Sequence, residues 1–266
     1  MGVVNVTPDS FADGGRYFDK TRAVEHALRL IDEGADILDI GGESTRPGAG
    51  MVTAGEEMRR VLPVVEALIG NGIPVSVDTN KAEVMREALA AGASMINDIS
   101  ALHSTEAMAV VAQSDCAVCL MHMQNDPASM QAAPHYRDVV GEIKVYLSAR
   151  LAAAEAAGIC RERIAIDPGF GFGKTAAHNL VLLRELGEFT GLGVPVLVGW
   201  SRKGTIGKIT GRATEDRVHG SVAAALMAVE RGAAIVRVHD VAATRDALAM
   251  HCAVRDAVDN PVPAHG

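Results

Sequence analysis

The chain has 266 residues, 48% of them hydrophobic, which is enough to bury one large core. Its net charge is −8, from 33 acidic and 25 basic residues, and only 3% of its residues are aromatic. This composition argues against nucleic-acid binding, and no apolar run approaches the ~20 residues that span a bilayer. Because no basic N-terminal segment precedes an apolar stretch, we expect a cytoplasmic protein that binds neither nucleic acid nor membranes.

Short runs rich in β-branched residues alternate with longer helical patterns along the whole chain. In chain order, strands are predicted at 3–6, 37–43, 74–79, 95–99, 116–123, 164–169, 194–201 and 234–240. In the first helical pattern Val24, Ala27, Leu28 and Ile31 follow i, i+3, i+4, i+7 spacing, which predicts that they share the buried face. A further helix is predicted over 136–157.

Eight such β–α units predict a single (β/α)8 TIM barrel that forms one domain over residues 1–266. No low-complexity linker or change of composition divides the chain. A doubly wound open sheet is the structural alternative. In a barrel, binding and catalytic groups lie on the loops that follow the carboxyl ends of the strands.

Cys116 and Cys119 have the spacing of a redox pair or half a zinc site. They fall within a strand-like run, where residues three apart point to opposite faces. Buried, reduced thiols are therefore the favoured interpretation. The histidines lack the paired spacing of a catalytic zinc site.

Polar residues gather at the predicted carboxyl ends of most strands. They are Asn5, Asp39, Glu43 to Arg46, Asp78, Asn97, Asp98, Asp167, Ser201 to Lys203, Arg237 and His239. Each alone could be a helix cap or a surface residue. Buried charge at a barrel mouth is costly unless it is used, so a functional ring is favoured.

The ring divides by charge. The anion-binding groups Ser201, Lys203, Arg237 and His239 follow the last two strands, where barrels commonly hold phosphate, and Arg46 could join them. On the opposite side, Asp78, Asn97 and Asp167 suit a neutral heterocycle rich in N–H donors.

The stretch DPGFGFGKT, 167–175, resembles a phosphate loop, but Pro168 occupies the position of the first glycine that such a loop requires. We interpret it as the loop after the sixth strand. Its glycines allow sharp turns and close approach to a ligand. Lys174 is interpreted as a loop or helix-start residue.

Eight motifs together resemble the dihydropteroate synthase family of pterin-binding enzymes. They are NVTPDSFADGG (5–15), GGESTRPGA (41–49), SVDT (76–79), NDI (97–99), LMHMQ (120–124), DPGFGFGKT (167–175), LVGWSRKG (197–204) and RVHD (237–240). They cover essentially the whole chain in order. The resemblance implies that 6-hydroxymethyl-7,8-dihydropterin pyrophosphate is joined to p-aminobenzoate, with release of pyrophosphate, in folate biosynthesis.

The resemblance also implies the site residues. Pterin binding falls to Asp78, Asn97, Met121, Asp167 and Lys203, and pyrophosphate binding to Asn5, Arg46, Ser201, Arg237 and His239. The p-aminobenzoate pocket, which sulfonamides also enter, comprises Phe11, Thr45, Pro47, Phe172, Ser201 and Lys203. Asn5 and Asp13 would hold the cofactor Mg²⁺, and the expected catalytic residues are Asp78, Asp167, Lys203 and Arg237.

Three further expectations concern the barrel floor, the oligomeric state and two loops rich in glycine. Family members usually carry a short N-terminal hairpin that closes the barrel floor, whereas this sequence begins at its first strand, so either the floor is open or the true start lies upstream. A homodimer is expected. The loops over 7–17 and 44–54 are expected to become ordered when ligands bind. The functional alternatives are a pterin-dependent methyltransferase and a catalytically silent pterin-binding barrel.

Overall fold

The computed structural model describes residues 1–7, 16–44, 50–127 and 129–257. Its eight strands form one parallel sheet in the order of the sequence. They are β1 (Gly2–Asn5), β2 (Leu38–Gly41), β3 (Val75–Asp78), β4 (Met95–Asp98), β5 (Ala117–Met121), β6 (Ile164–Asp167), β7 (Val196–Val198) and β8 (Ala233–Val236). All eight predicted strands are therefore confirmed.

Backbone hydrogen bonds between the two ends of the sheet close it into a barrel. The amide of Val3 donates to the carbonyl of Val238 at 3.0 Å, and the amide of Val238 donates to the carbonyl of Met1 at 2.9 Å. Gly2 and Val238 form a parallel bridge beside these bonds. The predicted (β/α)8 barrel is thus confirmed, and the alternative of an open sheet is excluded.

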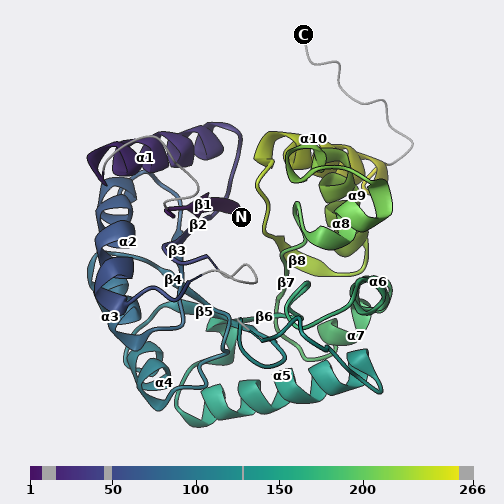
Figure 1. Cartoon of the computed structure of the whole chain (residues 1–266), viewed down its shortest axis with the longest axis horizontal. Helices are drawn as coiled ribbons and strands as arrows, with labels where there is room; N and C mark the ends of the chain where they lie inside the picture. The colour runs from purple at the N-terminus through teal and green to yellow at the C-terminus, as the bar shows by residue number, and fades with distance from the viewer. Residues whose placement is uncertain (8–15, 45–49, 128, 258–266) are drawn as a thin grey trace.

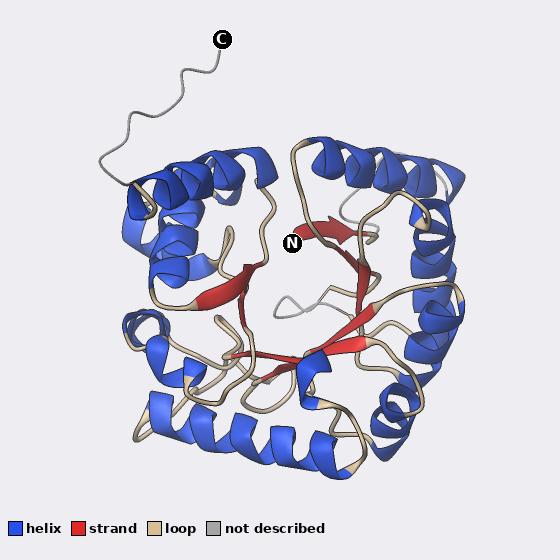
Figure 2. Ribbon diagram, turned by 180° about the vertical axis from the view of Figure 1, so that it is seen from behind, coloured by secondary structure: helices blue, strands red, loops and turns tan. Residues whose placement is uncertain are grey.

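Helices surround the strands on all sides (Figures 1 and 2). The α-helices are α1 (Arg16–Asp32), α2 (Ala54–Leu68), α3 (Ala82–Ala90), α4 (Thr105–Ala112), α5 (Val139–Ala156), α6 (Ala176–Arg184), α7 (Gly187–Thr190), α8 (Gly204–Thr210), α9 (Val218–Glu230) and α10 (Val241–Arg255). Two short 3-10 helices, η2 (Arg161–Arg163) and η3 (Thr214–Asp216), precede β6 and α9. Within the described part of the chain, no helix combines the length and apolarity that a bilayer crossing requires.

The alternation of side chains along the strands divides the core into two parts. Outward-facing strand residues such as Ile40, Val77 and Ile96 pack with the helices in the larger cluster. A small inner cluster fills the barrel below the mouth and consists of Met1, Met95, Cys119, Ala165 and Leu197. Inward positions nearer the carboxyl ends of the strands carry polar residues instead, so the mouth is the polar end of an otherwise apolar interior.

Local predictions were mostly confirmed. The helix expected over 136–157 is α5, and Cys116 and Cys119 are buried in the outer and inner clusters respectively, as opposite faces require. The buried face of α1 was predicted wrongly at Leu28, which is 40% exposed. The stripe of α1 that is fully buried is Ala23, Ala27 and Leu30, at i, i+4 and i+7.

Candidate active site

Arg237 lies at the centre of the charged cluster inside the mouth. Its Nε donates to Oδ2 of Asp39 at 2.5 Å, and its Nη2 donates to Oδ2 of Asp78 at 2.9 Å. Nδ2 of Asn97 donates to the same Asp39 oxygen at 3.0 Å. Side chains from β2, β3 and β4 therefore converge on the residue that follows β8. Arg237 was predicted to lie with the basic residues, opposite the acids, whereas the structure places it among the acids.

Asp167 faces the same interior space as Arg237, from β6 across β7. Gly199 lies between them, and a Cβ at that position would be 3.8 Å from Cβ and Cδ of Arg237 and 4.0 Å from Oδ2 of Asp167. The other Asp167 oxygen, Oδ1, accepts the amide of Gly169 at 2.7 Å. The absence of a side chain at Gly199 keeps the space between the two charged groups open.

Burial makes the carboxylates of this cluster harder to ionise. It raises the pKa of Asp78 to about 7, against the opposing effect of Arg237, and the nearby Asp39 adds to the rise. It also raises the pKa of Asp167, where the Lys203 ammonium is the largest opposing group. Carboxyl groups with raised pKa values inside a mouth are typical of binding and catalytic sites.

Lys203 is held against the loop that follows β6. Its Nζ donates to the carbonyl of Phe170 and lies 4.6 Å from the ring centroid of Phe172. Burial lowers the pKa of Lys203 to about 8, while the charge of Asp167 opposes the shift. The ammonium is thus largely charged at neutral pH but releases its proton more readily than a surface lysine.

Ser201 and His239 contact each other beside this cluster. Nδ1 of His239 lies 3.0 Å from Oγ of Ser201, and the amide of His239 donates to the same oxygen at 3.2 Å. Asn5 and His239 share a pocket of about 440 Å³, which is lined by Val3, Asn5, Arg22, Glu25, His26, Arg29 and His239. Asn5 and Asp78 also lie close to each other, since a Cβ at Gly41 would meet Oδ1 of Asn5 at 3.8 Å and Oδ2 of Asp78 at 3.9 Å.

Met121 and Phe172 contribute apolar surface to the same region. Met121 is buried on β5 directly beside Asp167 of β6. Phe172 is partly exposed in the loop that also carries Phe170. Five predicted site residues lie outside the described part of the chain, namely Phe11, Asp13, Thr45, Arg46 and Pro47. The same holds for residues 8–15 of the loop over 7–17 and residues 45–49 of the loop over 44–54.

Three members of the predicted polar ring are structural. Both carboxylate oxygens of Asp98 accept backbone amides, from Ser100 and Leu102 at 2.7 Å each, so Asp98 stabilises the turn after β4. Arg202 forms an ion pair with Asp240, and Glu43 pairs with Lys81. These residues lie at strand ends, as predicted, but their contacts are with neighbouring loops and helices.

Asp39 has a larger role in the site than its residue type and position in the sequence indicated. It was counted in the polar ring without a role, yet it is fully buried and binds both Arg237 and Asn97. Two signals could have identified it. Its position alternates with Leu38 and Ile40, so it faces inward, and a buried carboxylate needs a cationic partner.

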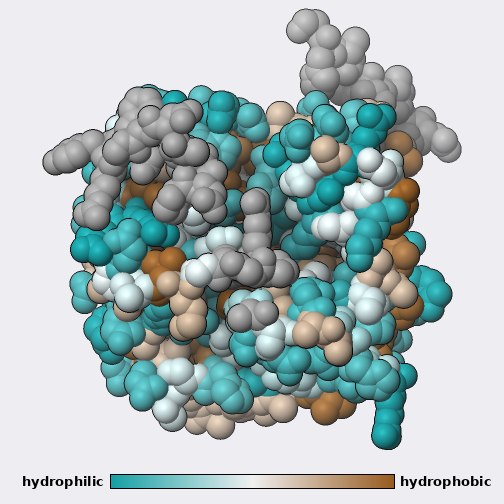
Figure 3. Space-filling view, viewed as in Figure 1, coloured by the Kyte–Doolittle hydropathy of each residue, from teal (hydrophilic) through white to brown (hydrophobic). Residues whose placement is uncertain are grey.

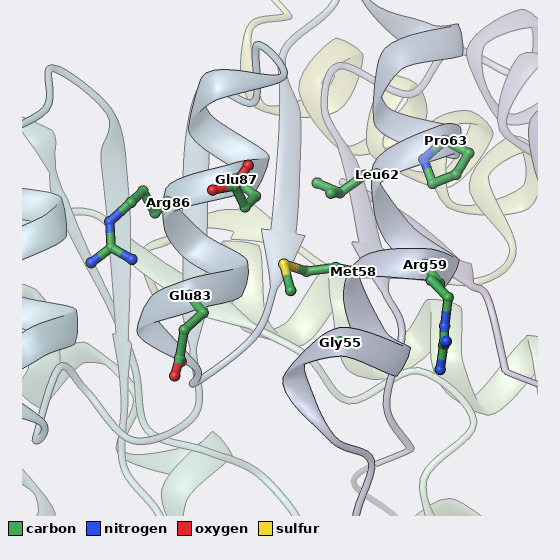
Figure 4. Close-up of a pocket in the computed structure, with 8 residues that line it drawn as sticks. All are labelled: Gly55, Met58, Arg59, Leu62, Pro63, Glu83, Arg86 and Glu87. Carbon is green, nitrogen blue, oxygen red and sulfur yellow. The ribbon is translucent and has the colours of Figure 1, made fainter.

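A larger groove of about 610 Å³ lies outside the barrel and is separate from the mouth. Figure 4 shows that it runs between α2 and α3, and its lining is Gly55, Met58, Arg59, Leu62, Pro63, Glu83, Arg86 and Glu87. None of the predicted site residues lines it.

Figure 3 shows that the face of the molecule around the barrel axis is mostly hydrophilic where it is described, with only scattered apolar residues.

The pterin binding enzyme family matches residues 1–239. The chain is 55% identical over 255 residues to the dihydropteroate synthase of Neisseria meningitidis serogroup B, covering 93% of this chain and 90% of that protein. The chain belongs to the dihydropteroate synthase family.

Solved structures of dihydropteroate synthases share the whole fold. The Xanthomonas albilineans enzyme with 4-aminobenzoic acid is 56% identical with a TM-score of 0.92, covering 97% of this chain and 93% of that one. The same organism's dihydropteroate synthase in complex with 7,8-dihydropteroate is 51% identical with a TM-score of 0.86 and the same coverage. The resemblance seen in the eight motifs is thereby confirmed over nearly the whole chain.

Proposed function

We propose that the chain is a dihydropteroate synthase that condenses 6-hydroxymethyl-7,8-dihydropterin pyrophosphate with p-aminobenzoate to give 7,8-dihydropteroate and pyrophosphate. The observation that carries the proposal is that Asp167 and Arg237 face one interior space across Gly199, within a chain of this family. A carboxyl group that can stabilise a cation and a guanidinium that can stabilise an anion thus lie on either side of Gly199.

The pterin ring would bind on the side of Asp78, Asn97 and Asp167. Carboxylates accept hydrogen bonds from the N–H groups of a pterin, and the Asn97 amide, which donates to Asp39, has an oxygen that can accept another. Met121 beside Asp167 offers an apolar surface for the flat ring. Lys203, next to Asp167, would donate to a ring oxygen or nitrogen.

The pyrophosphate would bind to Asn5, Ser201, Arg237 and His239, with Arg46 from the second loop. A guanidinium has five N–H donors, and the two contacts to Asp39 and Asp78 use two of them. Arg237 can therefore remain paired and still contact an anion. Ser201 and His239 supply further donors close by.

The p-aminobenzoate ring would bind against Phe172, Lys203 and Ser201, together with Phe11, Thr45 and Pro47. Support comes from the position of the Lys203 ammonium over the Phe172 ring, which places a cation beside an apolar surface. A benzoate requires both features. A dihydropteroate synthase of this fold has been solved with 4-aminobenzoic acid.

The reaction would proceed by an SN1-like step without a covalent enzyme intermediate. When pyrophosphate leaves the pterin methylene, the ring spreads the positive charge, and ionised Asp78 and Asp167 favour that cation electrostatically. Arg237 and its neighbours favour the departing anion. The arylamine is already a nucleophile, so no strong base is needed. A pterin–enzyme adduct trapped on quenching would contradict this mechanism.

Mg²⁺ is proposed as the cofactor, held by Asn5 and Asp13. Mg²⁺ binds oxygen ligands and usually takes few protein groups beside substrate phosphates, and an amide oxygen next to the pyrophosphate residues suits that preference. Within the described residues, no group of three or more His, Cys, Asp or Glu side chains could hold a metal without substrate. When bound, Mg²⁺ would neutralise charge on the leaving group.

We also propose that the protein acts as a homodimer in the cytoplasm. Apolar side chains are exposed on adjacent helices, at Leu180 of α6, Ile209 of α8 and Met227 of α9. A patch of this kind is suited to a contact between two copies of the chain. Analytical ultracentrifugation at micromolar concentration would test the dimer.

Incubation with both substrates tests the function. We expect 7,8-dihydropteroate and pyrophosphate in equal amounts, identified by mass spectrometry and a phosphate-coupled assay. A pterin-dependent methyltransferase or a silent pterin-binding barrel would give neither product. A methyltransferase would also have no use for the Ser201, Arg237 and His239 cluster.

A further inference from the structure

The loop after β6 contains a buried lysine to which the proposed reaction gives no role. Lys174 is only 3% exposed, although the sequence analysis interpreted it as a loop or helix-start residue. It does immediately precede the N-cap of α6, but its side chain turns inward beneath the loop. A buried lysine is costly unless its polar group is well satisfied.

Three polar atoms surround Nζ of Lys174. The carbonyl of Phe172 lies at 2.9 Å, Nδ1 of His122 at 3.0 Å and the carbonyl of His122 at 3.3 Å. The two carbonyl contacts use two N–H groups of the lysine, and the third contact joins Nζ to the imidazole through one shared proton. Lys174 therefore connects the loop after β6 to the segment that follows β5.

The two segments are packed so closely that only glycine fits between them. A Cβ at Gly169 would lie 1.9 Å from the carbonyl oxygen of His122, and a Cβ at Gly173 would lie 2.8 Å from that of Gln124. Both glycines have positive φ, 72° and 62°. The shape of the loop thus depends on its contact with residues 122–124.

Aromatic side chains hold the other partner of Lys174 in place. The ring of His122 packs edge-on against Tyr146 of α5, with centroids 4.9 Å apart, and the hydroxyl of Tyr136 donates to the carbonyl of Gly173 at 3.0 Å. The imidazole that contacts Lys174 is therefore fixed from the helix side. Burial and the adjacent Lys174 lower the pKa of His122 to about 3, so this ring is neutral at physiological pH.

The opposite side of the same loop forms part of the candidate active site. The carbonyl of Phe170 accepts from Lys203, and the ring of Phe172 lies beneath the Lys203 ammonium. The Nζ of Lys174 donates a hydrogen bond to the backbone carbonyl of Phe172. A change at Lys174 would consequently be transmitted to the position of Lys203 and of the Phe172 ring.

We propose that Lys174 is a positioning residue, which anchors the 169–173 loop to His122 and so places Phe172 and Lys203 for p-aminobenzoate. The part of this proposal that concerns p-aminobenzoate rests on the proposed function. The position of the loop does not, and it can be measured without any substrate.

The single tryptophan of the chain reports on this loop. Trp200 is stacked on Phe170, with ring centroids 4.7 Å apart, and is only 4% exposed. For Lys174→Met, which keeps an unbranched side chain one atom shorter and removes its donors, we expect faster acrylamide quenching of Trp200 fluorescence. We also expect the KM for p-aminobenzoate to rise about tenfold or more.

Two further variants separate positioning from stability. Leu151→Ala serves as a control, because truncating this buried side chain of α5 leaves a cavity in the core and should lower the melting temperature by a comparable amount. This control should keep wild-type quenching and KM. The double variant His122→Phe with Lys174→Met removes both buried polar partners and should recover stability. We expect the double variant to keep the raised KM and the faster quenching. If Lys174→Met alone fails to fold, the double variant takes its place in both measurements.

Wild-type quenching and KM in the Lys174 variants would overturn the proposal, as would a KM that recovers together with stability in the double variant. A wild-type chain without synthase activity would contradict the proposed function instead. In that case the quenching comparison alone would decide whether Lys174 positions the loop.

Discussion

Nε of Arg237 lies 2.5 Å from Oδ2 of Asp39, although the two residues are 198 positions apart in the sequence. The pair joins the residue that follows β8 to β2 inside the barrel. Asp39 is fully buried, and its Oδ1 has no hydrogen-bond partner among the described residues. The same guanidinium that is proposed to bind pyrophosphate therefore also neutralises a buried carboxylate.

This double role predicts that Arg237→Met loses both activity and stability. Removing one partner of a buried ion pair leaves an uncompensated charge, which costs about 3–5 kcal/mol of unfolding free energy. Urea denaturation and a pyrophosphate-release assay measure the two effects, and a variant with wild-type stability would show that Asp39 is not buried as a charged group.

A companion variant isolates the electrostatic part of that cost. Asp39→Asn combined with Arg237→Met removes both charges, so we expect part of the lost stability to return while activity stays absent. An equally unstable double variant would mean that packing of the guanidinium, and not its charge, stabilises the barrel.

Lys203 is predicted to matter for the reaction and not for the fold. Because burial lowers its pKa to about 8, the buried ammonium costs the folded state stability at neutral pH, and Lys203→Met should leave the unfolding free energy unchanged or raise it. Turnover should fall by about 100-fold, the cost typical of losing a group that contacts the reacting molecule. The matched control is Lys208→Met on α8, where the lysine is exposed and both measurements should be unchanged. Unchanged turnover in Lys203→Met would remove Lys203 from the site.

The raised pKa of Asp78 predicts a pH-dependent stability. The folded protein holds a proton on Asp78 up to about pH 7, whereas the unfolded chain releases it near 3.8, so the folded state binds more protons between these values. The unfolding free energy therefore falls as pH rises from 4 to 7. Asp78→Asn cannot titrate and should lack this part of the fall, on the order of 3 kcal/mol.

Urea titrations of wild type and Asp78→Asn at pH 5, 6, 7 and 8 measure this difference. The variant carries a constant cost for the lost contact with Arg237, so only the change of the difference with pH is informative. The variant should gain stability relative to wild type as pH rises. A difference that stays constant across the range would mean that Asp78 titrates at its ordinary pKa.

The proposed metal site predicts that activity depends on added Mg²⁺. Treatment with EDTA should abolish pyrophosphate release, and Mg²⁺ should restore it. Asn5→Ala should need a higher Mg²⁺ concentration for half-maximal activity, because one oxygen ligand is lost. Full activity in excess EDTA would exclude a metal from the reaction.

The barrel and the inward strand residues could be predicted from sequence because both follow from short-range patterns. The alternation along each strand places Asp78 and Asp167 inside, and the order of the strands brings their ends to one mouth. The pairing of Arg237 with Asp39 and Asp78 could not be predicted, because it depends on which inward groups meet across the barrel. The burial of Lys174 could not be predicted for a similar reason. Its position before α6 suggests exposure, and only the packing of the loop against His122 buries it.

The structure of the protein soaked with the dihydropterin pyrophosphate tests the central claim most directly. We predict that the pterin ring lies against Asp78, Asn97 and Asp167, and that the pyrophosphate contacts Ser201, Arg237 and His239. Electron density for the ring outside the barrel mouth, or for the pyrophosphate away from Arg237, would contradict the account.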